Sequence, residues 1–181
     1  MNRTNRLNVL VFFGLVTLGV LSRFTGIAPN FAAVSAIALF AGFFFAGRVV
    51  AVAVPIGAML ISDAIIGWHD ARQMAVVYAC LAMPVLLRSW LRGNPTMARG
   101  IAASLACSTA FFLFTNMAVW GFGSMYTHDL AGLALCFERG LPFFRFTIAG
   151  DLAFAVLLFG AYRLATRSAV EARPVAIPTR G

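Results

Sequence analysis

The run "VVAVAVPIGAMLISDAII", Val49 to Ile66, decides how the rest of the chain is interpreted. A helix of this length extends about 27 Å, which is close to the hydrocarbon thickness of a bilayer. Its one charged residue, Asp63, lies near the end of the run. The run therefore predicts a membrane-spanning helix, and it raises the question of what a carboxylate faces there.

The composition extends this interpretation to the whole chain. Of 181 residues, 61% are hydrophobic and 11% are charged, whereas soluble domains are about half apolar and about a quarter charged. A globule of this size cannot bury that apolar excess, so we expect one integral membrane domain. The net charge of +8 comes from arginines that lie singly or in small groups between apolar runs, so we expect no nucleic acid partner.

Apolar segments of spanning length recur along the chain, and helices are the only plausible spanning form for such long runs. We expect an all-α six-helix bundle within a single domain, 1–164, with helices near 7–22, 31–47, 49–66, 74–90, 100–120 and 143–164. The rest of the chain, 165–181, contains prolines and has no apolar period, so we expect a disordered cytoplasmic tail.

The arginines predict the orientation of this bundle. With the N-terminus in the cytoplasm, ten arginines fall on the cytoplasmic side and four on the other. Basic residues are enriched in cytoplasmic loops, so we expect both termini to be cytoplasmic. The N-terminal segment begins like a signal peptide but has no clear cleavage site, and we interpret it as a retained first helix.

With this topology, polar residues embedded in apolar sequence gather at the outer ends of the helices. They are Arg23, Asn30, Asp63, Tyr78, Asn116, Trp120, Arg145 and Asp151. A charge in hydrocarbon is costly, so it should face the bundle interior and be paired. We expect Asp63 and Asp151 to pair with Arg145 or Arg23 around a polar chamber that opens outward.

The connection from Gly121 to Pro142 is long for a helical bundle, and long connections are often lids or binding loops. Its stretch "THDLAGLALCFERG" predicts a short helix that Thr127 or Asp129 caps and Gly140 ends. We expect this segment to lie as a lid over the outer mouth of the bundle.

Other interpretations of the same residues remain open. Intramembrane Asp–Arg pairs often only hold a bundle together, and Asn116 is equally suited to bonding a backbone carbonyl. The histidines His69 and His128 show no metal-ligand spacing, and a buried cysteine such as Cys80 is usually a packing residue. Because no catalytic or nucleotide motif is present, we expect no enzyme activity, no cofactor and no metal.

Several blocks of the chain, in order, resemble the DUF6580 family of small bacterial six-helix membrane proteins, which are taken to be transporters. The blocks include "VPIGAMLISDAIIGWH", "FFLFTNMAVW" and "AGLALCFERGLPFFRFTIAGDLAFAVLLFG", and the resemblance runs from about Arg23 to Tyr162. The family pattern falls on Pro29-Asn30-Phe31, Ser62-Asp63, His69, Tyr78, Thr115-Asn116, Trp120, Pro142-Phe143-Phe144 and Gly150-Asp151.

This family looks like the substrate-binding S components of energy-coupling-factor (ECF) vitamin transporters, and it is similar to BtuM-type cobalamin transporters. The resemblance implies an outward pocket closed by loops, in a multi-pass protein of the bacterial inner membrane. It also implies an energising ATPase module as a partner, although the first helix carries Gly14 and Gly19 in place of the AxxxA docking pattern. A cysteine that ligates cobalt is implied for the BtuM type, and Cys80 is the nearest candidate.

We therefore expect a membrane substrate-binding or transport protein for uptake of a small micronutrient, a vitamin or vitamin precursor, with a cobalamin-like ligand among the options. The substrate-binding residues would be Asp63, Asn116, Arg145, Asp151, Asn30, Tyr78, Trp120 and His69. The partners would be the small ligand, the lipid bilayer, and an ATPase module or further copies of the chain. The alternatives are a membrane-embedded protein that modifies a ligand through Cys80 or the histidines, and a non-transporting structural subunit.

Overall fold

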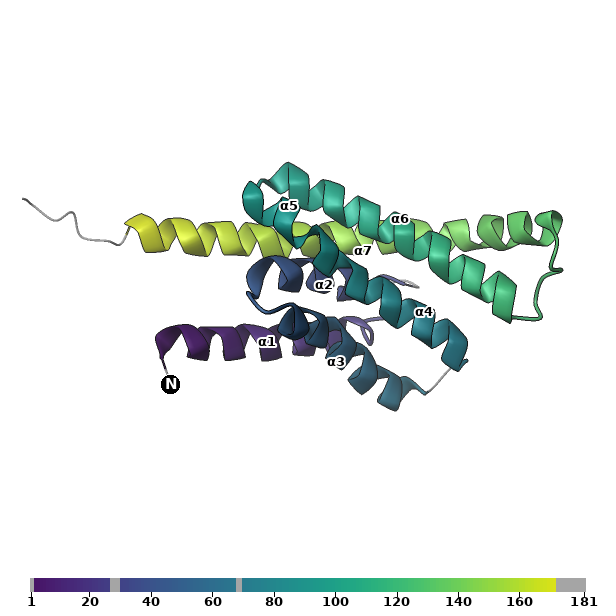
Figure 1. Cartoon of the computed structure of the whole chain (residues 1–181), viewed down its shortest axis with the longest axis horizontal. Helices are drawn as coiled ribbons and strands as arrows, with labels where there is room; N and C mark the ends of the chain where they lie inside the picture. The colour runs from purple at the N-terminus through teal and green to yellow at the C-terminus, as the bar shows by residue number, and fades with distance from the viewer. Residues whose placement is uncertain (1, 27–29, 68–69, 172–181) are drawn as a thin grey trace, which may run out of the picture.

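The computed structural model describes residues 2–26, 30–67 and 70–171, and all its regular elements there are helical. The elements in chain order are α1 Arg3–Ser22, α2 Val34–Phe44, α3 Arg48–Ile66, α4 Ala71–Ala82, the 3-10 helix η1 Met83–Leu87, α5 Arg88–Gly93, α6 Met97–Phe122 and α7 Leu130–Glu171. Figure 1 shows the start of α1 and the end of α7 at the same end of the molecule, with the α6–α7 connection at the other. The predicted all-α class is confirmed.

Helices of spanning length and apolar composition number five among the described residues. They are Thr4–Ser22, Arg48–Ile66, Ala71–Gly93, Met97–Phe122 and Leu130–Ser168. The chain therefore has the character of a multi-pass membrane protein. The second of the six predicted spans, 31–47, contains only the 11 residues of α2 in helical form, about 16 Å at the usual rise per residue.

The short helix α2 forms the centre of the fold. Nine of its residues are buried, and it packs against α1, α3, α6, α7 and η1. A helix that is apolar all round belongs in the interior of a bundle, which explains why this segment is not lipid-facing. Its last turn meets α7 through aromatic contacts, with the Phe40 and Phe159 ring centroids 5.4 Å apart.

The carbonyl groups at the C-terminal end of α2 are bound by arginines. Arg92 donates from Nε to the Phe43 carbonyl at 2.7 Å and from a terminal nitrogen to the Phe45 carbonyl at 2.5 Å. Arg88 donates to the Ala46 carbonyl at 2.6 Å. A helix end leaves carbonyls without a partner inside the helix, and these side chains bind the Phe43 carbonyl and the two carbonyls that directly follow α2.

The fourth span is a compound helix rather than the single helix predicted near 74–90. It consists of α4, the five-residue 3-10 helix η1 and α5. Pro84 near the start of η1 has no N–H group to donate to a carbonyl one turn earlier. The tighter 3-10 turn accommodates this loss, since short 3-10 stretches are common where helical bonding is interrupted.

The predicted break before the last helix is wrong. The sequence predicts a short helix ending at Gly140 and a new one from residue 143. Instead, α7 is a single helix of 42 residues that runs unbroken through Pro142. Packing against α6 overrides the local signals, because Phe112 on α6 stacks on Phe144 with ring centroids 4.4 Å apart. Neighbouring helices allow proline and glycine inside membrane helices in this way.

The predicted disordered tail, 165–181, is also corrected in its first part. Helix α7 extends to Glu171, so residues 165–171 are helical, and the remainder of the tail lies outside the described residues. The predicted starts of α1, α4 and α6 lie three or four residues inside the observed ones, so for these helices the sequence pattern marks the apolar centre rather than the polar ends.

Candidate functional site

A cavity of about 290 Å³ lies among the helices, with walls from α2, α3, α4, α6 and α7 and from the residues between α1 and α2. Its apolar wall includes Met59, Val77 and Phe111. Its polar wall consists of Arg23, Asn30, Ser35, Asp63, Gln73, Tyr78, Thr147 and Asp151. Small-molecule sites combine an apolar lining with a few placed polar groups in this way.

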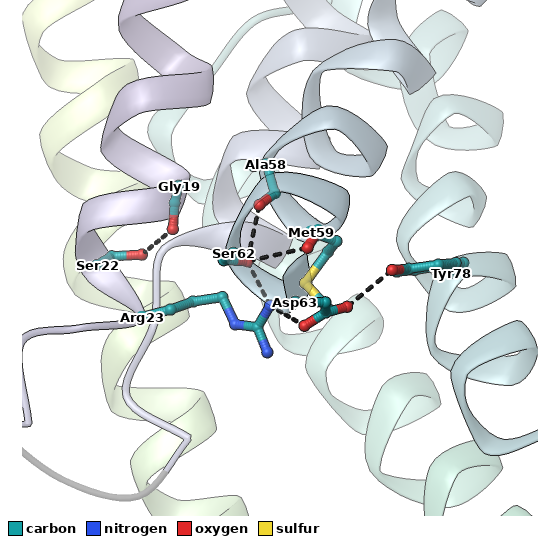
Figure 2. A network of polar contacts seen from close by, with 8 residues as sticks. All are labelled: Gly19, Ser22, Arg23, Ala58, Met59, Ser62, Asp63 and Tyr78. Atoms are coloured by element: carbon teal, nitrogen blue, oxygen red, sulfur yellow. Dashed lines mark hydrogen bonds and ion pairs between the residues drawn. The ribbon is translucent and has the colours of Figure 1, made fainter. Parts of the chain in front are cut away.

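Asp63 faces Arg23, which directly follows α1, on one side and a tyrosine from α4 on the other (Figure 2). One carboxylate oxygen accepts a hydrogen bond and ion pair from Arg23. The other accepts from the Tyr78 hydroxyl at 2.7 Å. Asp63 is only 1% exposed, and a buried carboxylate is tolerated when it is both paired and hydrogen-bonded. This answers the question raised by its position in the apolar run.

The end of α1 is fixed so that Arg23 reaches this site. The Ser22 hydroxyl donates to the Gly19 carbonyl at 2.9 Å and accepts from the Ala33 N–H at 3.0 Å. It thereby ties the last turn of α1 to the residue before α2. Asn30, which lines the cavity, has a φ of 62°, a left-handed conformation that asparagine adopts more readily than most residues.

Asp151, from the middle of α7, reaches the cavity from the opposite side and is 1% exposed. Its Oδ2 atom lies 2.6 Å from the Ser108 hydroxyl of α6. A Cβ added to the preceding Gly150 would lie 3.3 Å from the Ala32 nitrogen, so glycine lets α7 approach the segment before α2 closely. Among the described residues, Asp151 has no ion-pair partner, since Arg23 pairs with Asp63.

The predicted role of Arg145 is wrong. Its side chain is exposed, lies over the Phe146 ring at 4.6 Å and does not line the cavity. Six residues of helix separate Arg145 from Asp151, which places the two about 120° apart around α7. Thr147, four residues before Asp151, shares its face and does line the cavity. The expected pairing therefore holds for Arg23 with Asp63 alone.

Asn116 lies beside the cavity rather than in it. It lines a smaller adjoining cavity of about 170 Å³ between α6 and α7, which shares Asn30, Phe111 and Thr147 with the larger one. Its side-chain amide donates to the Phe112 carbonyl at 2.8 Å. This is the backbone-bonding role that the sequence left open for it.

Trp120 lies in the last turn of α6 and does not line the cavity. Its Nε1 donates to the Thr127 carbonyl at 2.9 Å, and its ring meets His128 edge-on with centroids 5.8 Å apart. The predicted site residue His69 lies outside the described residues. Of the predicted site residues, the structure therefore brings together Asn30, Asp63, Tyr78 and Asp151.

The predicted lid does not cover this cavity. Gly121 and Phe122 end α6, residues 130–142 belong to α7, and no lining residue comes from 121–142. The predicted cap is confirmed, because Asp129 accepts from the Gly132 N–H at 2.7 Å and from the Thr127 hydroxyl at 2.9 Å. The bond from Gly132, and then that from Thr127, holds the pKa of Asp129 below its ordinary value.

Four polar residues of this region lie outside the set predicted from the sequence: Ser35, Gln73, Thr147 and Ser108. Ser35, Thr147 and Ser108 carry hydroxyl groups, which are common in membrane helices and do not by themselves indicate a binding site. Their spacing carried a signal, since Thr147 and Asp151 are four apart on one helix face. Gln73 lies in the first turn of α4, and the helix predicted from residue 74 begins three residues after the observed start at Ala71.

The cysteines and possible metal ligands lie apart from the cavity. Cys80, Cys107 and Cys136 are free thiols, and none of them lines it. Within the described ranges, no three His, Cys, Asp or Glu side chains gather closely enough to hold a metal ion. The geometry therefore brings no thiol to the cavity as a ligand for a bound compound.

The chain belongs to the DUF6580 family, described as a family of unknown function, which matches residues 3–174. This confirms the family resemblance given by the sequence blocks. No curated protein matches the chain. No solved structure matches it either, so the likeness to ECF S components and BtuM-type transporters stays a prediction.

Proposed function

We propose that this DUF6580 member is a membrane substrate-binding or transport protein that takes up a small micronutrient through the cavity beside Asp63 and Asp151. The observation that carries the proposal is a cavity with two buried carboxyl groups inside a bundle of apolar helices. Ionisable groups within membrane helices are costly and commonly mark a substrate or ion path. A purely structural ion pair would not need the open volume beside it.

The cavity volume favours a small ligand. At about 290 Å³ it lies at the lower end of the range for small-molecule sites. A vitamin or precursor built on one or two small rings suits this space, whereas a corrinoid is far larger. Since Cys80 does not line the cavity either, the cobalamin-like option receives no support from this geometry.

The charges of the wall favour a neutral or cationic ligand over an anion. Arg23, the cavity's basic residue, is already bound to Asp63. Asp151 adds a second carboxyl group. The side chains of Asn30 and Gln73 line the cavity and make no hydrogen bond among the described residues, so they remain free to bind a ligand.

We further propose that the cavity opens away from the cytoplasm in the bacterial inner membrane. Arg88 and Arg92 gather at the C-terminal end of α2, whereas the cavity is lined by residues from the N-terminal end of that helix. Basic residues favour the cytoplasmic side, so this arrangement puts the cavity toward the outside. An ATPase module or further copies of the chain would then be partners in moving the ligand across.

The test is the small molecule that the protein retains when it is purified gently and analysed by native mass spectrometry. Val77 lines the cavity and Ala75, on the same helix, is exposed and does not. We expect Val77→Trp to fill the cavity and abolish retention, while Ala75→Trp keeps it. Equal retention by both variants would show that the compound binds elsewhere and would overturn the proposal.

A further inference from the structure

Two buried serines in this fold make the same backbone contact but have different partners. The Ser62 hydroxyl donates to the Ala58 carbonyl at 2.8 Å, and the Ser108 hydroxyl lies 2.9 Å from the Ser104 carbonyl. Both carbonyls belong to the residue one turn earlier, a usual partner of a serine within a helix. The two serines therefore provide a matched pair for comparing how their remaining bonds are made.

At Ser62 a charged donor completes the hydrogen bonds. The single hydroxyl proton is shared between two carbonyls of its own helix, those of Ala58 at 2.8 Å and Met59 at 3.0 Å, and the oxygen accepts from the Arg23 guanidinium. The same guanidinium group pairs with Asp63. A serine hydroxyl has one proton to donate and two lone pairs to accept with, so this arrangement is complete with an ionised Asp63.

At Ser108 no charged donor takes part. The Ser108 hydroxyl lies 2.9 Å from the Ser104 carbonyl and 2.6 Å from Asp151 Oδ2. When Asp151 is ionised, both neighbours are acceptors and share the one hydroxyl proton. If Asp151 carries a proton, it donates to Ser108 and Ser108 donates to the carbonyl, so both contacts are hydrogen bonds.

The surroundings of Asp151 supply no positive charge to hold it ionised. Titratable groups near it are Cys107 on α6 and, across the cavity, Asp63 with its partners Tyr78 and Arg23. On α2 the Ser35 side chain and the Ala36 N–H also hydrogen-bond to Asp151, but both are neutral groups. A buried carboxylate without a charge partner is costly, and the usual outcome is that it takes up a proton.

A second buried hydroxyl beside this contact has no partner. Ser104 is 2% exposed, and its Oγ atom makes no hydrogen bond among the described residues. It lies one turn before Ser108 on α6. Buried polar atoms without partners are rare, so the hydroxyl groups on this face of α6 are not all paired among the described residues.

We propose that Asp151 is a proton-binding site of the cavity, which holds its proton at neutral pH and passes it to water in the cavity as the pH rises. The O–H bond of the carboxyl group breaks, water takes the proton, and the electron pair stays on the carboxylate. The consequence for the ligand rests on the proposed function. With Asp151 protonated, and with Arg23 and Asp63 neutralising each other, the cavity is uncharged overall at neutral pH. The resting cavity then accepts a neutral hydrogen-bonding compound.

The test is infrared difference spectroscopy of the full-length protein in lipid, which reads the C=O stretch of a neutral carboxylic acid without any ligand. We expect this band at neutral pH in the unmodified chain. It should vanish in Asp151→Asn and stay in Asp129→Asn, which removes an exposed carboxyl group. In Ser108→Ala the band should move in frequency because its hydrogen-bond partner is gone.

A spectrum without a neutral-acid band at neutral pH would overturn the proposal. A band whose frequency is the same in Ser108→Ala would also overturn it. The Ser108→Ala spectrum therefore tests the proposal even if Asp151→Asn does not fold. A carboxylate band that responds to added sodium ions would assign a metal cation to the site instead. Because the spectra are taken without ligand, their failure is distinct from failure of the retention test with Val77→Trp.

Discussion

Arg23 and Asp63 lie 40 residues apart in the chain and form an ion pair inside the helix bundle. The Arg23 side chain is 19% exposed and that of Asp63 is 2% exposed, so neither has full access to water. The same guanidinium binds Ser62, and Tyr78 binds the other carboxylate oxygen. The pair therefore connects α1, α3 and α4 at the wall of the cavity.

Removal of Arg23 is predicted to destabilise the protein strongly. Arg23→Ala leaves the Asp63 carboxylate buried without its charge partner, and breaking a buried pair in this way costs about 3–5 kcal/mol. The control is Arg72→Ala, because the Arg72 and Asp70 side chains are 63% and 39% exposed and exposed pairs contribute about 0–1 kcal/mol. Thermal unfolding in detergent measures both, and equal small shifts in Tm would contradict the prediction.

The contact between α1 and α3 depends on a glycine. A Cβ added to Gly19 would lie 2.7 Å from the Ala58 Cβ, whereas a Cβ at Gly14 would meet nothing within 4 Å. We expect Gly19→Ala to destabilise the fold by about 1–3 kcal/mol through overpacking, and Gly14→Ala to leave the Tm nearly unchanged. Adding Ala58→Gly to Gly19→Ala should restore most of the loss, and the absence of any restoration would count against this contact.

The sequence was enough to predict the helical class and the burial of Asp63 beside an arginine, with Arg23 and Arg145 both open as partners. The lengths of the apolar runs and the cost of a charge in the membrane can be judged from the sequence alone. It could not place Arg145, whose helix phase relative to Asp151 depends on α7 being continuous through Pro142. The sequence patterns at Gly140 and Pro142 favour a helix end, and only packing against α6 overrides them. The sequence also could not show that α2 is buried in the bundle, because a buried helix and a lipid-facing helix have similar apolar composition.

The C-terminal end of α2 is predicted to depend on Arg92. Arg92→Ala removes two hydrogen bonds to the carbonyls of Phe43 and Phe45, and hydrogen bonds to a charged group contribute about 1.5–3 kcal/mol each. We expect a loss of a few kcal/mol, seen as a lower Tm. Arg167→Ala, which changes an exposed arginine of α7, should have almost no effect, and similar Tm values for both variants would refute the role of Arg92.

The first turn of α7 is predicted to loosen in acid. The folded-state pKa of Asp129 is lowered by its bonds from Gly132 and Thr127, so its stabilising effect is present above its ordinary pKa and is lost as the pH falls through the folded-state value. Hydrogen exchange of the Gly132 amide should therefore speed up at low pH, beyond the intrinsic pH dependence. Asp129→Asn keeps an acceptor without the titrating charge and should remove this extra acceleration. If the Gly132 amide still exchanges faster at low pH in Asp129→Asn, a group other than Asp129 causes the acceleration.

Labelling of single cysteines is predicted to show which way the cavity faces. In a chain with Cys80, Cys107 and Cys136 replaced by serine or alanine, Ser124→Cys lies in the exposed α6–α7 connection and Asn94→Cys in the exposed turn before α6. Because α6 runs between them as a candidate span, the two thiols must lie on opposite sides of the membrane. We expect a membrane-impermeant maleimide to label position 124 in intact cells and position 94 only after permeabilisation. The reverse pattern would put the cavity end of the bundle toward the cytoplasm, and uptake from outside through the cavity would then have to be abandoned.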